Sequence, residues 1–322
     1  MKMVFRLAFV GLAVVLLLGV SFSQTAAAPD PVIKAWSANL NAGREEYFII
    51  WHDGNSFFGH FVRDNGLSRG DIVEIGGTPG AARTIELAFN GRRGEWIFFW
   101  NNGENIMGRH LFENGKPKGP EFVVVPGVAA EMELSINKNG QWLLGWPDAD
   151  GNWWNQVIDN VGTTRRGPAI LAGTGGIYGQ PADYAPGRDR REHQLVWSVG
   201  NTVYAQLFFS HGQPKGGPFV LIDNAVGPDI IGAGVPLIFR RDGNIYSQNL
   251  FSSLSPRGTP MLGLDTGGRK LAPATFRNAR RGGRLMSFIS DGNAYYSMEW
   301  FSNGAPVKGT FRHIFNVAQQ AN

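Results

Sequence analysis

Six basic residues recur at one position of a sequence repeat and are the most regular chemical feature of the chain. Each stands immediately before a glycine, at Arg69, Lys118, Arg166, Lys215, Arg257 and Lys308. If they form a ring on one face, several cations could contact one polyanion or acidic glycan, so we name them as ligand-binding candidates. The alternative is structural, and it is the more common use: a Lys or Arg on an outer strand discourages pairing with another molecule.

Two arginine-rich segments add further candidate binding residues. The first is an insertion from Tyr184 to Glu192, and the second runs from Arg277 to Arg284 at the matching place of a later repeat. Loops on a rigid scaffold commonly carry recognition, so both could contact a ligand, although solvated loops of this composition are also common. The candidates in these segments are Arg188, Arg190, Arg191, Arg277, Arg280 and Arg281.

Catalytic and metal-binding patterns are few. The sequence has no Gly-x-Ser-x-Gly, no His-Glu-x-x-His, no phosphate-binding glycine loop and no cysteine. Asp148, Asp150 and Asn152 resemble the start of a calcium loop but lack its distal glutamate, so they are a weak candidate. Acidic residues on inner strands could still form a glycosidase-like pair, or simply line a polar channel. These residues are Glu131, Glu133, Asp183 and Asp229. We expect no cofactor and favour a non-catalytic role, and we keep an enzymatic role as the alternative.

Repetition predicts the elements that position these residues. Six tight turns end in Gly54, Gly103, Gly151, Gly200, Gly243 and Gly292, at intervals of 49, 48, 49, 43 and 49 residues. A second glycine follows each by about 16 residues. Each unit reads as four short strands, in the second unit Arg83 to Asn90, Glu95 to Trp100, Asn105 to Phe112 and Pro120 to Val125. We therefore predict an all-β fold, a six-bladed β-propeller with four antiparallel strands per blade.

Several columns of the repeat have structural interpretations. The second strands are continuously apolar, as expected for strands buried on both faces. Four units carry a tryptophan at the end of this strand, and core packing is a better explanation for these residues than sugar stacking. They are Trp51, Trp100, Trp146 and Trp197, whereas the fifth and sixth units have Arg240 and Ile289. The chain starts an inner strand near Val32 and ends an outer strand near Val317, so we expect side-chain packing between the first and last blades to close the ring.

The N-terminal segment predicts export. Lys2 and Arg6 precede an apolar run from Leu7 to Val20 and a small-residue stretch to Ala28, which is typical of a cleaved signal peptide in residues 1–28. The remaining residues, 29–322, form one predicted domain with no membrane span. Without Lys2 and Arg6, the 30 basic residues become 28 against 26 acidic ones, which does not favour a nucleic-acid partner. We expect a monomer in the periplasm or outside the cell.

The repeat resembles a known type of secreted bacterial β-propeller. The shared features are Trp-x-Asp-Gly-Asn, an aromatic followed by a small residue (Phe58-Gly59, Tyr204-Ala205), and Asn-Gly-x-Pro-x-Gly. This resemblance implies an extracellular or envelope scaffold that binds a protein or a glycan, without fixing the ligand. Arg240 and Ile289 depart from it, which argues against six identical sites. The alternatives are a carbohydrate-active enzyme with carboxylates at the ring axis and a structural envelope component without a small ligand.

Overall fold

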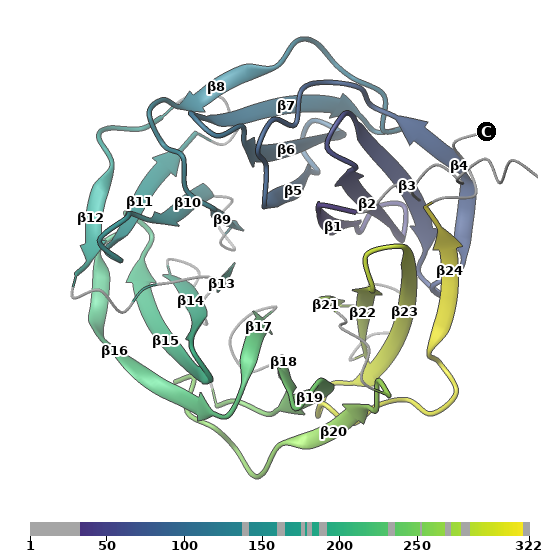
Figure 1. Cartoon of the computed structure of the whole chain (residues 1–322), viewed down its shortest axis with the longest axis vertical. Helices are drawn as coiled ribbons and strands as arrows, with labels where there is room; N and C mark the ends of the chain where they lie inside the picture. Colours follow the sequence, from purple (N-terminus) through teal and green to yellow (C-terminus); the bar gives the residue numbers. More distant parts are fainter. Residues whose placement is uncertain are drawn as a thin grey trace, which may run out of the picture. The chain divides into compact units, whose positions relative to one another are not determined.

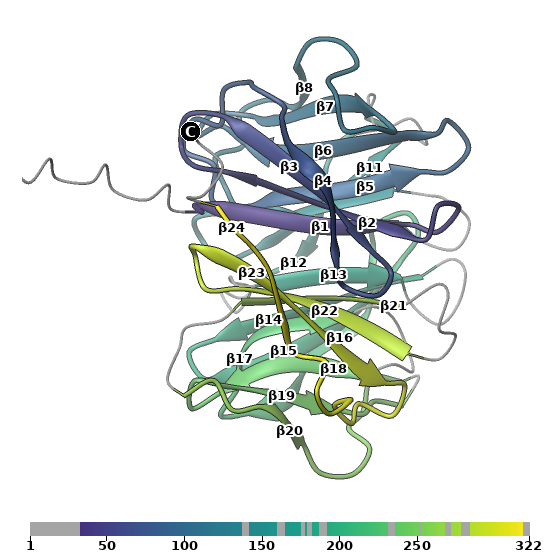
Figure 2. The same ribbon diagram turned by 90° about the vertical axis from the view of Figure 1, so that its right-hand side faces the viewer.

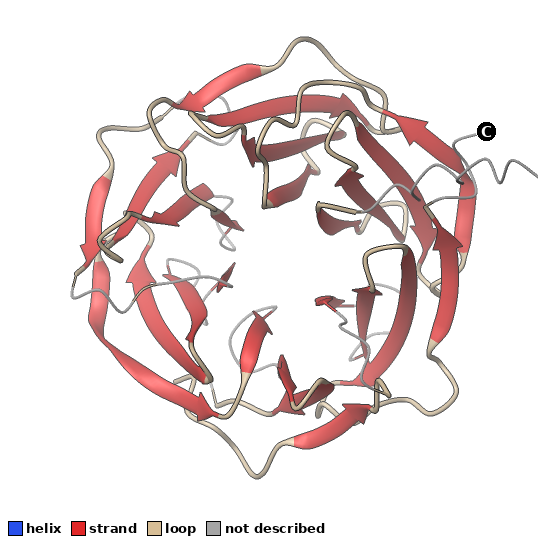
Figure 3. Cartoon of the chain, viewed as in Figure 1, coloured by secondary structure: helices blue, strands red, loops and turns tan. Residues whose placement is uncertain are grey.

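The structure is a computed structural model, and its described residues all belong to the compact unit Pro31–Asn322. They are residues 33–136, 142–159, 165–174, 178, 182–186, 192–230, 236–251, 253–267, 272–277 and 284–317. The predicted signal peptide, residues 1–28, lies outside this part. The described residues form strands and turns (Figure 3), and none of them belongs to a helix that could cross a membrane.

Within this unit, 24 strands form six separate four-stranded antiparallel sheets arranged around a common axis (Figure 1). Each sheet contains four strands consecutive in sequence, and the first of each lies nearest the axis. This is a six-bladed β-propeller, as the repeat predicts. We number the blades in chain order, from blade 1 (β1 to β4) to blade 6 (β21 to β24).

The strands of the first three blades have the following bounds: β1 Ala35–Asn41, β2 Glu46–His52, β3 Phe57–Arg63, β4 Ser68–Glu74; β5 Ile85–Asn90, β6 Glu95–Asn101, β7 Ile106–Phe112, β8 Phe122–Val125; β9 Glu133–Ile136, β10 Trp142–Pro147, β11 Trp153–Ile158 and β12 Ile170–Gly173. Blade 2 agrees with the strands expected from the sequence to within about two residues at each end, the usual uncertainty of a strand boundary.

The strands of the last three blades have these bounds: β13 Ala182–Pro186, β14 Glu192–Val199, β15 Thr202–Phe209, β16 Pro214–Asp223; β17 Val226–Ile230, β18 Leu237–Arg241, β19 Asn244–Gln248, β20 Met261–Leu264; β21 Ala272–Arg277, β22 Arg284–Ser290, β23 Ala294–Phe301 and β24 Arg312–Asn316.

The core lies between neighbouring blades. Every residue of β2 and of β6 is buried, as predicted for the apolar runs Tyr47 to Trp51 and Trp96 to Trp100 within them. One core cluster joins Phe48 and Phe57 of blade 1 to Phe98 and Trp100 of blade 2. The tryptophan column is part of this packing, because Trp51, Trp100, Trp146 and Trp197 are all buried. The core-packing interpretation of that column is therefore confirmed.

The second glycine of each unit marks an irregularity where the outer strand begins. Gly70, Gly119, Gly167, Gly216, Gly258 and Gly309 all have positive φ, between 73° and 104°, and a register shift on the outer strand follows in blade 1. In three blades, a buried glutamine of the third strand donates its side-chain N–H to the carbonyl of this glycine. These glutamines are Gln156, Gln206 and Gln248. These three polar side chains therefore have a structural role.

The ring closes where blade 1 meets blade 6, at the side that Figure 2 turns toward the viewer. A single core cluster contains Tyr47 and Trp51 of blade 1 together with Phe288, Tyr295 and Phe315 of blade 6. The first sheet is formed by β1 to β4 and the last by β21 to β24, so no strand is exchanged between them. The prediction that side-chain packing joins the first and last blades is confirmed, and Phe315 is part of this packing.

Candidate functional site

The six cations that precede the second glycine lie at the start of the outer strand or just before it. In three blades they form an ion pair with a buried glutamate at the start of the second strand: Arg69 with Glu46, Lys118 with Glu95, and Lys215 with Glu192. Half of the column therefore serves to compensate buried negative charge within its own blade. This use was not evident in the sequence, because the partners are about 23 residues apart.

Glu95 shows the electrostatics of this arrangement. Its side chain is 1% exposed, and Lys118 Nζ lies 2.6 Å from its Oε2. Burial alone would raise the pKa of Glu95, but the hydrogen bond from Lys118 and the charges of His110 and Arg93 together hold the pKa below its ordinary value. The carboxyl is thus ionised and compensated inside the blade at neutral pH.

The other three cations of the column, Arg166, Arg257 and Lys308, are exposed, and within the described part of the chain no ion pair holds them. Arg257 lies over the ring of Phe251, 5.6 Å from its centroid. A polyanion contact by this column stays a prediction. The arginine-rich segments also stay predictions: Arg188, Arg190, Arg191, Arg280 and Arg281 lie outside the described residues, and only the backbone of Arg277, at the end of β21, is described.

The acidic residues of the inner strands are partly brought together. Asp183 on β13 accepts a hydrogen bond from the backbone N–H of Ile230 in blade 5. Burial raises the pKa of Glu86, on β5, well above its ordinary value, and the negative charge of Asp183 raises it further. Sequence reasoning omitted Glu86, although its place on an inner strand was a usable signal. Glu131, Glu133 and Asp229 lie on or beside inner strands as expected.

The weak calcium candidate forms a hydrogen-bonded turn. Asp148 Oδ1 accepts the backbone N–H groups of Asp150 and Asn152 at 3.0 and 2.9 Å. Its Oδ2 accepts the side-chain N–H groups of Trp154 and Asn152 at 2.9 and 3.0 Å. These bonds, chiefly the one from Trp154, lower the pKa of Asp148 to about 2. Both carboxylate oxygens therefore have N–H donors, and among the described residues no group of three or more His, Cys, Asp or Glu side chains could hold a metal ion.

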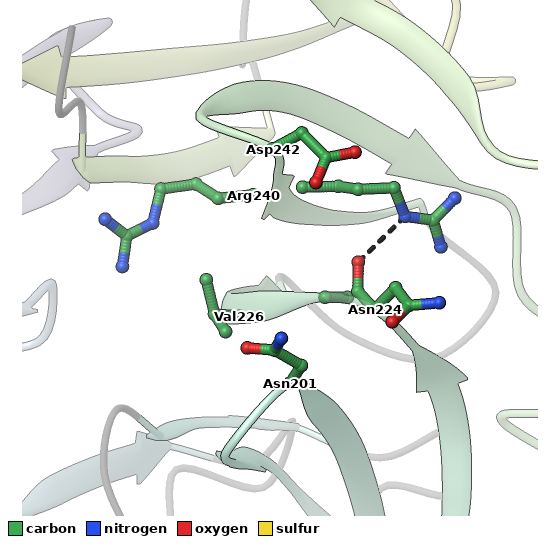
Figure 4. A pocket seen from close by; sticks show the side chains of 7 residues that line it. Asn201, Asn224, Val226, Arg240 and Asp242 are labelled. Atoms are coloured by element: carbon green, nitrogen blue, oxygen red, sulfur yellow. Dashed lines mark hydrogen bonds between the residues drawn. The ribbon is translucent and has the colours of Figure 1, made fainter. Parts of the chain in front are cut away.

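A polar pocket of about 530 Å³ lies between blades 4 and 5 (Figure 4). Its walls come from the turn between β14 and β15, the link from β16 to β17, and the end of β18 with its following turn. The lining residues are Asn201, Asn224, Ala225, Val226, Arg240, Arg241 and Asp242. Two guanidinium groups, two amides and one carboxylate therefore surround a space large enough for a small ligand.

The pocket coincides with the place where the repeat changes. Trp197, in the tryptophan column of blade 4, packs in a cluster with Leu143 and Trp153 of blade 3. Trp51 of blade 1 likewise packs against Tyr295 of blade 6. Blade 5 has Arg240 at the corresponding place in the sequence, but in the structure Phe239 packs toward the preceding blade, in a core cluster with Val196 and Ala205. Phe239 stacks on Tyr246 as Trp197 stacks on Tyr204. Side chains alternate along a strand, so Arg240 lies on the other face of β18 from Phe239. The change in the repeat therefore does not by itself account for the pocket.

By sequence, the chain matches no family profile and no curated protein. By fold, it is similar to AofleA from Arthrobotrys oligospora, with a TM-score of 0.63 and 10% identity over 88% of this chain and 87% of that one. It is also similar to the BP39L lectin from Burkholderia pseudomallei, with a TM-score of 0.56 and 14% identity over 89% of this chain and 100% of that one. A third similar structure is the SapL1 lectin in complex with alpha methyl fucoside, with a TM-score of 0.55 and 11% identity over 87% of this chain and 98% of that one. At these identities the likeness shows a shared propeller fold.

Proposed function

We propose that this propeller is an exported, non-catalytic carbohydrate-binding protein, and that its sugar ligand occupies the pocket between blades 4 and 5. The observation that carries the proposal is the chemistry of that pocket. Asn201 and Asn224 offer amide donors and acceptors, Asp242 offers an acceptor pair, and Val226 offers an apolar contact. A sugar presents alternating hydroxyl groups and C–H surface, which this set of side chains complements.

Two further observations support a binding role over the alternatives. BP39L and SapL1, which share the fold, are named as lectins, and SapL1 is described in complex with a fucoside. Side chains in the pocket are held by rigid elements: Arg241 donates hydrogen bonds to the carbonyls of Asn224 and Asp223, at 2.8 and 2.9 Å. A wall that is fixed before the ligand arrives reduces the entropy lost on binding.

The experiment is a glycan array with the chain lacking residues 1–28, followed by calorimetry on the sugars that bind. Arg240→Trp removes the guanidinium group and places a bulky indole at a residue that lines the pocket, so we expect it to abolish binding. Asp53→Asn, at the equivalent turn of blade 1, is the control and should bind as the unchanged protein does. Binding that survives Arg240→Trp would place the site elsewhere, and silence on the array would favour a structural envelope component.

The same experiment separates binding from catalysis. Burial and the negative charge of Asp183 raise the pKa of Glu86, and glycosidases use a carboxylic acid of raised pKa as their general acid, so Glu86 is the residue to test. Chromatography of each bound oligosaccharide after incubation shows whether it is cleaved. We expect the sugars to be recovered intact; cleavage that Glu86→Gln abolishes would establish an enzyme instead.

A further inference from the structure

Arg240 differs from the other polar residues of the pocket because it has a buried donor without a partner. Its Nε is buried and makes no hydrogen bond to any described residue, and no described carboxylate lies within 4.0 Å of the guanidinium group. A buried N–H group without an acceptor is costly. Buried polar groups in native proteins are nearly always paired, so this donor calls for an explanation, and a bound anion would supply one.

The second arginine of the pocket, Arg241, is already engaged. Its guanidinium group lies over the rings of Phe239 and Tyr246, 5.4 and 5.6 Å from their centroids, and donates to two backbone carbonyls. In Figure 4 the side chains of Arg240 and Arg241 extend in opposite directions from β18, with the dashed bond drawn from Arg241. Arg241 therefore forms a wall, and Arg240 is the cation that is available to a ligand.

The backbone beside Arg240 leaves room for its guanidinium group. Gly227, on β17, has a φ of +57°, and a Cβ atom there would lie 2.8 Å from Nη2 and 2.9 Å from Nε of Arg240. A side chain at position 227 would thus displace the guanidinium group.

From these observations we propose that the sugar bound in the pocket carries an anionic group, a carboxylate or a sulfate, and that Arg240 binds this group. The inference rests on the proposed function and specifies its substrate class. A guanidinium group binds such an anion through two parallel N–H donors, which fixes the orientation of the sugar as well as adding affinity. Asp242, Asn201 and Asn224 then remain for the hydroxyl groups of the ring.

The test compares sugars that differ only in the anionic group. Calorimetry with the chain lacking residues 1–28 uses methyl galactoside, the methyl glycoside of galacturonate, and methyl galactoside 6-sulfate, together with the matching glucose series. We expect the carboxylated or the sulfated member to bind at least about tenfold more tightly than its neutral counterpart. The two anionic sugars identify which group the site prefers.

Two variants assign this preference to Arg240. Arg240→Gln should reduce the affinity for the anionic sugar by about 10- to 100-fold and leave the neutral sugar nearly unchanged, because only the charge-assisted bonds are lost. Gly227→Ala should have the same selective effect without changing any charge. Arg312→Gln, an exposed arginine on the outer strand of blade 6, is the control and should bind as the unchanged protein does.

Each outcome distinguishes this inference from the function on which it rests. Equal binding of neutral and anionic sugars, or a preference that survives Arg240→Gln in a protein with native circular dichroism, would overturn the anionic specificity and leave the lectin proposal standing. Absence of binding to any sugar would overturn both. Binding of an acidic peptide through Arg240, in place of any sugar, would also overturn the inference.

Discussion

Buried glutamates at the start of the second strand show how single residues adapt the repeat. Glu46, Glu95 and Glu192 are nearly inaccessible to water, yet each is paired with the cation that precedes the second glycine. In blade 6, Arg284 occupies the glutamate position and binds Glu299 of β23 at 2.8 Å, whereas Lys308 of the cation column is exposed. A charge at this position is therefore compensated here too, although by a residue outside the cation column.

Replacing Lys118 should destabilise the protein because it leaves Glu95 with fewer partners. We expect Lys118→Gln to lower the free energy of unfolding by about 1–2 kcal/mol at pH 7, since a buried carboxylate loses one charge-assisted bond but keeps Arg93 nearby. Lys308→Gln, at the same position of blade 6, has no carboxylate partner among the described residues and should change stability by under about 0.5 kcal/mol. Urea unfolding of the two variants provides the measurement.

The effect of Lys118→Gln should also depend on pH in a defined direction. The pKa of Glu95 is lower in the folded state than in the unfolded state, so its contribution is present above the ordinary carboxyl pKa and is lost as pH falls through the folded value. The difference between the variant and the unchanged protein should therefore shrink below about pH 4. A difference that stays constant down to pH 2 would show that lost packing, and not the ion pair, causes the destabilisation.

Not all of these residue roles could be predicted from the sequence. The cation column was visible because it repeats six times, but its glutamate partners are distant in sequence and only three of the blades show the pairing. The pocket was not predictable. The sequence shows Arg240 in place of a tryptophan, but it does not show that Phe239 packs toward the preceding blade instead or that the residues around Arg240 leave a pocket.

At three junctions, the hairpin between the third and outer strands of a blade accepts a hydrogen bond from the preceding blade. Ser297 of blade 6 donates to the carbonyl of Gly66 in blade 1, at 3.2 Å. In the same way Asn155 of blade 3 donates to Gly212 of blade 4 at 2.7 Å. Ser247 of blade 5 binds Gly304 of blade 6 at 2.5 Å. These contacts set the spacing between blades, because a turn and a short side chain meet without intervening space.

Glycine should therefore matter more at this hairpin than its backbone conformation alone requires. Gly66 and Gly70 have similar φ values, +79° and +73°, but a Cβ atom at Gly66 would overlap Oγ of Ser297, whereas one at Gly70 meets nothing within 4 Å. We expect Gly70→Ala to cost about 1–2 kcal/mol from strain, and Gly66→Ala about 1–3 kcal/mol more from overpacking. Thermal unfolding followed by circular dichroism can measure both. Equal losses would mean that the contact with Ser297 adapts freely.

The strands were predictable because alternating and continuous apolar patterns repeat with the same turn residues. A single unit would have left helix and strand ambiguous for its short apolar segment, and six units in register remove that ambiguity. The contacts between hairpins were not predictable. They join residues from neighbouring units whose distance depends on the twist and spacing of the blades, which the sequence does not state.

Closure of the ring depends on the junction between blades 1 and 6. These two blades are not consecutive in the chain, so non-covalent contacts join them. The backbone N–H of Ile33 donates to Gly292 at 2.9 Å, and that of Val317 donates to Asn293 at 2.9 Å. Between these bonds, the ring of Phe315 lies 5.4 Å from Trp51, 4.9 Å from Tyr295 and 4.5 Å from His60, measured between centroids. Phe315 therefore touches aromatic side chains of both blades.

Truncation of Phe315 should open this junction before it affects the rest of the ring. We expect Phe315→Ala to lower the free energy of unfolding by about 3–5 kcal/mol, because the removed ring leaves a cavity that stiff aromatic neighbours cannot fill. Hydrogen exchange at the amides of Ile33 and Val317 should accelerate more than exchange at Val196, inside blade 4. Phe311→Ala, which removes a partly exposed ring just before β24, is the control and should cost about 1 kcal/mol or less. Uniform acceleration across all blades would show instead that the propeller opens as one cooperative unit, and that the junction is no weaker than any other contact between blades.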